Sequence, residues 1–393
     1  MTDDSPPAGP DADPTDPTTP PEPLVEPLDA DLAAVVAAFE RRGLPPWHAL
    51  SVDGARSLEA ELFTPDDPPP VDAVREFAID RTARPDSTAA RPDSRTARPD
   101  STADTAAVDD DLRLRVYRDG TTAPAEPGGD GDGDGGGDTG DRPPTTLFFH
   151  GGGWTLGTLD SADDVARLLA RRTGSVVVSV DYRLAPEHPF PAAVDDAFAA
   201  LRWTASHAGR LGGDPDRLVV AGTSAGGGLA AATALRAAAA RERGDGTLPA
   251  LAGQLLLYPM LDADLDRRSY DEFADAPLLS RADVAWFWDQ YCRSPVDAVN
   301  PYAAPLRAVG PDGEARGPVD PARLPPAVIA TAGRDVLRDE ALAYGRRLAA
   351  AGVDVARVHR PALAHGFCSV ADRVPAADAA ADAVAGGLRA WFD

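Results

Sequence analysis

Beyond residue 144, short apolar runs alternate along the chain with longer stretches in which apolar side chains recur at helical spacing. A short aliphatic run is typical of a strand buried on both faces, and its alternation with helices indicates a parallel sheet. The apolar runs predict strands at 146–149, 175–180, 217–221, 253–258, 327–331 and 353–358. The stretches between them predict helices near 160–172, 192–208, 225–242, 337–351 and 375–391. We therefore expect an α/β fold with helices on both faces of a mostly parallel sheet.

Two further strands and two short helices are predicted before residue 144. Residues 71–81 predict a strand, and residues 112–117 alternate apolar and polar side chains like a half-exposed strand, which makes eight strands. The helical patterns that begin at Leu28 and Ser51 are too short to form a domain, so we expect them to pack on a later part of the chain. The predicted organisation is 28–70 for N-terminal cap helices, 71–393 for the main domain and 262–306 for a second cap segment.

Three segments have compositions that do not support a packed core. Residues 1–27 are rich in Pro, Asp and Thr, residues 82–107 repeat the sequence ARPDS, and residues 121–143 are rich in Gly and Asp. We expect a disordered tail and two low-complexity loop insertions. The formal net charge of −25 comes largely from residues 1–31 and 128–141. An acidic chain does not favour binding to nucleic acid or to an anionic membrane surface.

The sequence also argues against secretion, a membrane span and a disulfide framework. The N-terminus has no basic segment followed by an apolar one, as a secretory signal would. No uncharged apolar run is long enough to cross a bilayer. Cys292 and Cys368 are the only cysteines, too few for a disulfide framework. We expect a soluble, cytoplasmic protein without integral membrane association.

Ser224, between two glycines, is the first candidate for a catalytic group. The predicted strand at 217–221 leads into the sequence GTSAG at 222–226, and an alanine-rich helical pattern follows at once. A strand, a sharp turn and a helix are the context in which G-x-S-x-G holds a nucleophilic serine. Because the chain has 36 glycines, the pentapeptide alone is weak evidence.

A glycine-rich loop, HGGGW at 150–154, directly follows the predicted strand at 146–149. Its three glycines leave backbone N–H groups uncovered at the carboxyl end of a strand, where α/β sheets bind ligands. Such groups donate hydrogen bonds to the oxyanion that forms when a serine attacks a carbonyl. We expect this role once Ser224 is accepted as nucleophile; the alternative is a flexible glycine turn.

His365 is the candidate base and Asp335 the carboxylate that orients it. A nucleophilic serine needs a base, and the base needs an orienting acid. Of the six histidines, only His365 lies in a loop after the last predicted strand. Asp335 closes the preceding strand, whereas Asp339 and Glu340 are alternatives that could instead be charges at a helix N-terminus. The chain order Ser224, Asp335, His365 is the order expected of α/β-hydrolases.

Together these segments resemble the hormone-sensitive-lipase family of α/β-hydrolase esterases, from about residue 28 to residue 393 apart from the two insertions. The motifs that carry the resemblance are HGGGW at 150–154, DYRLAPEHPFPAA at 181–193, GTSAGG at 222–227, GRDVLRDE at 333–340 and HGF at 365–367. The resemblance implies an α/β-hydrolase fold with a central sheet of eight strands. It also implies a helical cap made of the N-terminal helices and residues 262–306.

The resemblance also implies roles for individual residues and for partners. Ser224 would be the nucleophile, His365 the base and Asp335 its partner. The oxyanion hole would be formed by backbone N–H groups of Gly152, Gly153 and Ala225, with Gly151 shaping the turn. The family needs neither metal nor cofactor. Dimerisation through the last strand or helix is common in it, so a homodimer is one expected assembly.

The sequence does not identify the substrate, because the roles of several positions near the predicted site are not determined. Three of them depart from the commoner family pattern without removing a catalytic group: Thr223, Gly228 and Val336. Trp154 and Tyr182 either line the substrate pocket or pack in the core. Arg183 and Glu187 are expected to pair with each other beneath the site.

We therefore predict a serine carboxylesterase that hydrolyses short- to medium-chain esters through an acyl-enzyme intermediate. One alternative is a small-molecule receptor on a hydrolase scaffold, which the presence of His365 disfavours. Another is an amidase or peptidase that uses the same triad. The aspartates of 130–141 match part of a calcium-loop template, but prolines flank them where helices should be, so we predict a solvated linker and no metal site.

Overall fold

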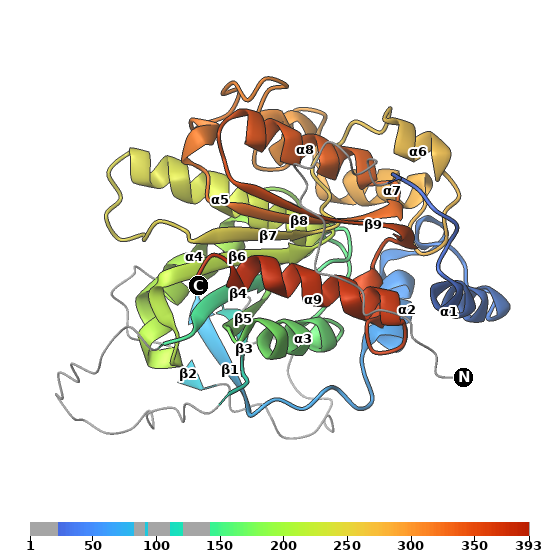
Figure 1. The fold of residues 1–393 in the computed structure, drawn as a ribbon, viewed down its shortest axis with the longest axis horizontal. Coiled ribbons are helices and arrows are strands. Elements are labelled where there is room, and N and C mark those ends of the chain that lie inside the picture. Colours follow the sequence, from blue (N-terminus) through green and yellow to red (C-terminus); the bar gives the residue numbers. More distant parts are fainter. Residues whose placement is uncertain (1–22, 82–90, 93–110, 121–141, 393) are drawn as a thin grey trace, which may run out of the picture.

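The computed structural model describes residues 23–81, 91–92, 111–120 and 142–392. Its strands form one sheet in the order β2-β1-β3-β5-β4-β6-β7-β8-β9 (Figure 1). Their bounds are β1 Ala73–Asp80, β2 Arg91–Pro92, β3 Asp111–Arg118, β4 Pro144–Phe149, β5 Val176–Asp181, β6 Asp214–Thr223, β7 Gly253–Leu257, β8 Ala327–Arg334 and β9 Val355–Ala364. The α/β-hydrolase fold is confirmed. All eight predicted strands are present, and the two-residue β2 pairs with β1 as a ninth. The tail predicted at 1–27 and the insertions predicted at 82–107 and 121–143 lie almost entirely outside the described residues.

Six strands of the sheet run parallel, from β5 through β4, β6, β7 and β8 to β9, whereas β1 and β3 are antiparallel to their neighbours. Every residue of β4 and β7 is buried, as expected for central strands covered on both faces, although β4 contains Thr145 and Thr146 and β7 contains Gln254. Because the six strands are parallel, their carboxyl ends share one edge of the sheet. The loops that follow β4, β6, β8 and β9 therefore meet there.

Helices cover both faces of the sheet. Helices α4, α5 and α8 pack on one face, and α3 and α9 pack on the other (Figure 1). Their bounds are α3 Asp163–Thr173, α4 Ala192–Leu211, α5 Ala225–Glu242, α8 Arg338–Ala350 and α9 Pro375–Arg389. Each face thus has its own apolar core, as expected for alternating strands and helices.

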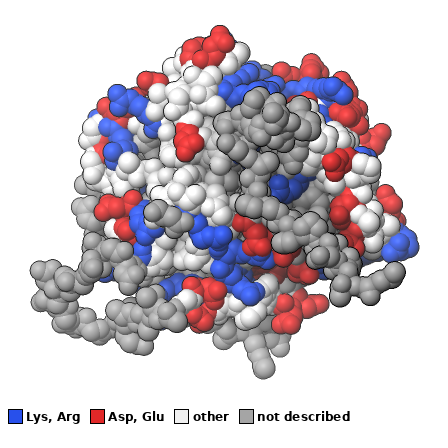
Figure 2. All heavy atoms as spheres, in the orientation of Figure 1, with Lys and Arg blue, Asp and Glu red and all other residues white. Residues whose placement is uncertain are grey.

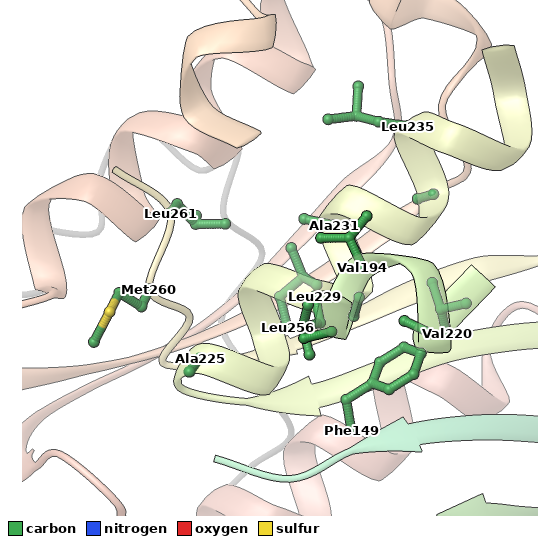
Figure 3. Close-up of a cluster of buried hydrophobic side chains, with 14 of the residues drawn as sticks. Phe149, Val194, Val220, Ala225, Leu229, Ala231, Leu235, Leu256, Met260 and Leu261 are labelled. Atoms are coloured by element: carbon green, nitrogen blue, oxygen red, sulfur yellow. The ribbon is translucent and has the colours of Figure 1, made fainter. Parts of the chain in front are cut away.

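Helix α5 is buried on nearly all sides, because it lies between the sheet and α4. Figure 3 shows its side chains Leu229 and Ala231 among residues of β4, β6 and β7. Its alanines and glycines allow a close approach to the surrounding backbone. At Gly228, an added Cβ would lie 2.3 Å from the carbonyl oxygen of Met260. The packing therefore requires glycine at this position.

The helices predicted as a cap come from two distant parts of the chain and lie at the same end of the sheet (Figure 1). The first part contains α1 Ala30–Arg41, the turn Trp47–Ala49 and α2 Val52–Phe63; the second contains α6 Arg268–Glu272 and α7 Arg281–Tyr291. The indole Nε1 of Trp47 donates to Leu278 O at 3.2 Å. The backbone N–H of His48 donates to Asp283 Oδ1 at 3.0 Å, and its ring Nδ1 lies 2.8 Å from the same oxygen. These bonds join the two parts into one cover.

Arg56 fastens α2 to the main domain. Its guanidinium donates to Thr155 O at 2.9 Å and to Ala185 O at 2.9 Å. It also forms an ion pair with Glu187 at 2.7 Å. The N-terminal cap helix α2 is therefore held by Thr155, directly after the glycine segment 150–154, and by the loop that follows β5.

The expected pairing of Arg183 with Glu187 is wrong, because the structure gives each residue a different partner. Arg183 donates from Nη2 to Asp196 Oδ1 at 2.8 Å and from Nε to Asp196 Oδ2 at 2.9 Å. Arg81 also reaches Asp196, at 3.2 Å. The Asp196 side chain is 1% exposed and lies on the first turns of α4, facing both arginines. Sequence proximity suggested Glu187, but the helix start brings Asp196 closer.

The face of the molecule in Figure 2 carries arginine and acidic side chains interspersed rather than a patch of one sign. Many are paired, for example Arg172 with Asp378 and Asp382. Within the described residues, no helix has the length and apolar character needed to cross a membrane. Cys292 and Cys368 are both free thiols.

Removing the Asp196 carboxylate should destabilise the fold, since two arginine side chains would lose a buried partner. We expect Asp196→Ala to lower the free energy of unfolding by about 3 kcal/mol. The neighbouring Asp195→Ala removes an ion pair to Arg236 that is half exposed, and should cost less than about 1 kcal/mol. Urea unfolding of both variants measures the difference. Equal losses would contradict a structural role for the Asp196 cluster.

Candidate active site

Ser224 lies at the turn between β6 and α5, at the carboxyl edge of the sheet. Its backbone has φ 54° and ψ −120°, a conformation that non-glycine residues rarely adopt. Its N–H donates to Leu257 O at 2.9 Å, and its carbonyl accepts from Met260 N at 3.0 Å. The neighbouring strand therefore fixes the strained turn from both sides.

The two glycines of the GTSAG sequence make this turn possible. A Cβ at Gly222 would lie 2.1 Å from Gly226 O, and a Cβ at Gly226 would lie 2.1 Å from Phe149 O. Neither distance is tolerated between non-bonded atoms, so both positions require glycine. The turn also presses α5 against the end of β4, which carries the glycine loop. The local sequence thereby places Ser224 next to that loop.

The candidate base and acid lie in line with Ser224. The Nε2 atom of His365 is 3.0 Å from Ser224 Oγ, and its Nδ1 atom is 2.8 Å from Asp335 Oδ2. The other carboxylate oxygen of Asp335 accepts from Leu337 N at 2.9 Å. The ring of Tyr258 packs edge-on against the imidazole with centroids 4.9 Å apart. Serine, imidazole and carboxylate thus form one continuous hydrogen-bonded series.

The two alternative acids have other partners. Asp339 accepts from Ser269 N at 2.9 Å and from Arg338 Nε at 2.8 Å. Glu340 is fully buried and accepts from Leu261 N at 2.6 Å and from the hydroxyl of Tyr270 at 2.9 Å. Both therefore tie α8 to the second cap segment instead of facing His365.

Four of the other histidines have contacts outside this series. His359 lies 2.8 Å from the Thr331 hydroxyl, within the sheet. His207 lies 2.9 Å from Trp203 O in α4, and His48 contacts Asp283. His150, in the glycine loop, holds Gly151 O at 2.7 Å, and burial lowers the pKa of its imidazole below the ordinary value. His150 is therefore neutral, with its Nδ1–H donating to that carbonyl.

The glycine loop faces the serine, as the sequence predicted. A Cβ at Gly151 would lie 3.4 Å from Ser224 Cβ. Gly151, Gly152 and Gly153 line the same cavity as Ser224 and His365. Within the described residues, the backbone N–H groups of Gly152, Gly153 and Ala225 donate to no protein acceptor. They are free to bind an external oxygen atom.

The cavity that contains Ser224 is lined in part by residues of the two predicted cap segments. Its walls are formed by aromatic and aliphatic side chains from both cap segments and from the main domain, among them Phe39, Trp47, Phe63, Leu278, Phe287, Phe148 and Val370. Thr223, the departure beside the nucleophile, lies in the same lining, and its Oγ1 would be 3.2 Å from a Cβ at Gly151. Its hydroxyl thus packs against the glycine loop rather than opening a new pocket.

Trp154 and Tyr182 do not line this cavity. Trp154 is 1% exposed and stacks on Tyr291 with centroids 4.1 Å apart. Tyr182 stacks on His150 at 4.2 Å, and its hydroxyl donates to His150 O at 2.9 Å. The packing alternative therefore holds for both. They support the glycine loop from behind.

Sequence reasoning missed the cap residues that face the serine. Phe39, Trp47, Glu59 and Phe63 all line the cavity, and all lie in the helical segments predicted only to pack on a later part of the chain. The sequence signal for these residues was the amphipathic spacing of the two N-terminal helices, because an apolar helix face has to pack against another part of the protein. In the described part of the chain, no cluster of three or more His, Cys, Asp and Glu side chains could hold a metal ion.

Comparison with known proteins places this geometry in context. The sequence profile of a family described as alpha/beta hydrolase fold matches residues 146–369. Carboxylesterase NlhH of Mycobacterium tuberculosis is 45% identical over 254 residues, which cover 64% of this chain and 73% of that protein. Esterase LipI of the same organism is 46% identical over 234 residues, covering 60% of this chain and 68% of its own.

Solved structures agree along most of the chain. The thermostable esterase from Pseudomonas putida ECU1011 superposes with a TM-score of 0.74 and 32% identity, covering 93% of this chain and 98% of that one. The Pyrobaculum calidifontis esterase gives a TM-score of 0.70 and 30% identity, covering 93% of this chain and 99% of that one.

The buried carboxyl group of Glu340, on the helix that follows Asp335, should make the stability of the fold depend on pH. Burial raises the pKa of Glu340 to about 8, although the Leu261 N–H and the Tyr270 hydroxyl oppose the rise. The native state then keeps a proton that the unfolded chain has lost, so the free energy of unfolding falls as pH rises from about 4.5 to about 8.

The Glu340→Gln variant lacks this titration. Relative to the variant, the natural chain should lose at least about 1 kcal/mol of stability between pH 5 and pH 8. Urea unfolding of both proteins across that range measures the difference. A difference that does not change with pH would contradict the raised pKa.

Proposed function

The chain belongs to the hormone-sensitive-lipase family of α/β-hydrolase esterases and is a carboxylic ester hydrolase, and on that premise we propose that it hydrolyses short- to medium-chain esters through an acyl-enzyme on Ser224. The observation that carries the proposal is the series Ser224 Oγ, His365 and Asp335, with contacts of 3.0 Å and 2.8 Å. Such a series at a strained strand-to-helix turn is the arrangement a serine nucleophile needs.

In the first half of the reaction, Ser224 Oγ attacks the ester carbonyl while His365 Nε2 accepts its proton. Asp335 accepts a hydrogen bond from the Nδ1–H of His365, which leaves Nε2 unprotonated and ready to act as base. The carboxylate also stabilises the imidazolium that results. When the tetrahedral intermediate collapses, the ester C–O bond breaks and His365 returns the proton to the leaving alcohol.

Backbone N–H groups of Gly152, Gly153 and Ala225 are proposed to bind the oxyanion. They line or adjoin the cavity and have no acceptor within the described residues. Ala225 is the first residue of α5, whose N-terminal end favours negative charge. Gly151 brings the loop against Ser224. In the second half, water attacks the acyl carbonyl while His365 takes its proton. The bond from the acyl carbon to Ser224 Oγ then breaks, the carboxylic acid leaves, and His365 returns the proton to Ser224 Oγ.

Two alternatives use the same fold. A non-catalytic receptor would need no base, yet His365 lies within hydrogen-bond distance of Ser224. An amidase or peptidase would share the triad, but the similar proteins are named as esterases and carboxylesterases. The cytoplasmic location, the homodimer and the independence from metal or cofactor stay predictions.

Substituting Ser224 tests the nucleophile. We expect Ser224→Ala to lower kcat for p-nitrophenyl butyrate at least about 10⁴-fold, since the acyl-enzyme has no oxygen to form on. The circular dichroism spectrum should be unchanged. Ser206→Ala, an exposed serine on α4, is the matched control and should keep full activity.

Two outcomes separate the alternatives. A fluorophosphonate probe should label the natural chain and not Ser224→Ala, whereas a receptor would be labelled in neither form. Faster cleavage of p-nitroanilides than of p-nitrophenyl esters would favour the amidase. Turnover that survives in Ser224→Ala would refute the proposed mechanism.

The aromatic wall of the cavity should set the acyl-chain preference. Phe39, Trp47 and Phe63 line the cavity that contains Ser224 and take up part of its space, so short and medium chains should fit better than long ones. We expect kcat/KM for p-nitrophenyl esters to peak between about two and eight acyl carbons and to fall at least about tenfold by palmitate. Phe63→Ala should move the peak toward longer chains. A peak at palmitate in the natural chain would contradict the assigned preference.

A further inference from the structure

One carboxyl group lies in the cavity of an otherwise apolar cap. Glu59 belongs to α2, is 8% exposed, and lines the same cavity as Ser224. Its neighbours on α2 and α1 in that lining are Phe63 and Phe39. An acidic side chain among aromatic ones is costly unless something compensates its charge or uses its oxygens.

Among the residues that the structure describes, no charged side chain is paired with Glu59. No arginine contributes to its pKa within the described part of the chain, and the lining contains neither arginine nor a second carboxylate. The nearest ionisable ring in the glycine loop, His150, is held neutral by burial. Burial raises the pKa of Glu59 above its ordinary value, and only the hydroxyl of Ser161 and the N–H of Gly157 oppose the rise.

The position of Glu59 relates it directly to the reacting groups. Gly157 lies against the glycine loop, since a Cβ there would be 2.3 Å from His150 Nδ1 and 2.8 Å from Gly151 O. Glu59 hydrogen-bonds to the Gly157 N–H, so it lies beside the glycine loop, and it shares one cavity lining with Ser224. Arg56, one turn earlier on α2, fixes the helix against Thr155 and Ala185. The carboxyl group is therefore held in place by a rigid attachment.

We propose that Glu59 is a specificity-determining residue that makes the enzyme prefer esters carrying a hydroxyl group remote from the scissile bond. The inference rests on the proposed function, because it concerns the cavity in which Ser224 acts. A hydroxyl group suits Glu59 in either protonation state: it donates to the carboxylate, and it accepts from the neutral acid. An ammonium group would have to lose its hydration in an apolar cavity, which a neutral hydroxyl avoids.

A second reading is purely structural, in which Glu59 ties α2 to the loop that holds Gly157 and Ser161. The two readings predict different stability. If the two neutral donors do not repay the burial of the Glu59 carboxyl group, an apolar side chain of similar volume removes a net desolvation cost, so Glu59→Leu should unfold at an equal or higher temperature than the natural chain. A structural tie would make the same variant less stable.

The experiment compares matched esters that differ only in a terminal OH or CH₃. The pairs are 5-hydroxypentyl acetate with hexyl acetate for the alcohol half, and methyl 6-hydroxyhexanoate with methyl heptanoate for the acyl half. The quantity measured is the ratio of kcat/KM for the hydroxyl ester to kcat/KM for its methyl partner. It is determined for the natural chain, Glu59→Leu, Glu59→Met and Glu59→Gln.

We expect the ratio of at least one pair to fall about tenfold or more in both apolar variants, because the hydroxyl loses its partner. Glu59→Gln keeps an acceptor and a donor, so it should retain most of the ratio. Glu61→Leu, which removes an exposed carboxylate from the same helix, is the matched control and should leave the ratio unchanged.

Ratios that stay within about twofold of the natural chain in both pairs would overturn the inference. The inference would also be overturned if kcat/KM fell equally for both members of a pair and the variant were less stable. That outcome indicates that Glu59 only ties α2 to the loop that holds Gly157 and Ser161. If Glu59→Leu does not fold, Glu59→Met gives the same comparison with a more adaptable side chain. Ser224→Ala is measured in parallel. Turnover that still depends on Ser224 while the ratios stay constant would refute the role of Glu59 and leave the proposed function standing.

Discussion

The site depends on one close packing contact, between the start of α5 and the ends of β4 and β6. Gly222 and Gly226 have no room for a Cβ, because a Cβ at either position would lie 2.1 Å from a backbone oxygen. Non-bonded atoms do not approach so closely. This contact forces Ser224 into a conformation that costs on the order of 1–3 kcal/mol. The surrounding packing supplies that energy, since α5 is buried on nearly every side. Ser224 lines the cavity, whereas most of the helix that follows it is buried.

The parallel order of the strands explains how residues far apart in the sequence reach this serine. The glycine loop follows β4, Asp335 follows β8 and His365 follows β9, so all three leave the sheet at the edge where Ser224 lies. A one-residue change in register would turn every side chain of a strand to the other face. The paired registers of β7, β8 and β9 thus fix the spacing of serine, imidazole and carboxylate as firmly as the local contacts do.

Much of this arrangement was predictable from the sequence because its signals are local or ordered along the chain. Apolar runs predicted six strands, residues 71–81 and the alternation at 112–117 predicted two more, and the order of serine, acid and base indicated which side chains should meet. Tertiary placement was not predictable in the same way. The partner of Arg183 is Asp196 and not Glu187, and Trp154 and Tyr182 pack behind the glycine loop. These outcomes depend on the three-dimensional position of a helix start or an aromatic ring. The spacing of residues along the chain does not determine that position.

The sheet and the cap segments meet different structural requirements. The sheet must hold three groups within hydrogen-bond distance, so its contacts are backbone bonds and close-packed glycines that tolerate little change. The cap must only enclose a substrate, so aromatic side chains of varied size can serve. Glu59 is the carboxyl group in that enclosure, and its desolvation is opposed only by the Ser161 hydroxyl and the Gly157 N–H among the described residues. Two neutral donors offset the burial of a carboxylate only in part, so an oxygen of a bound substrate is a further partner that this side chain can take.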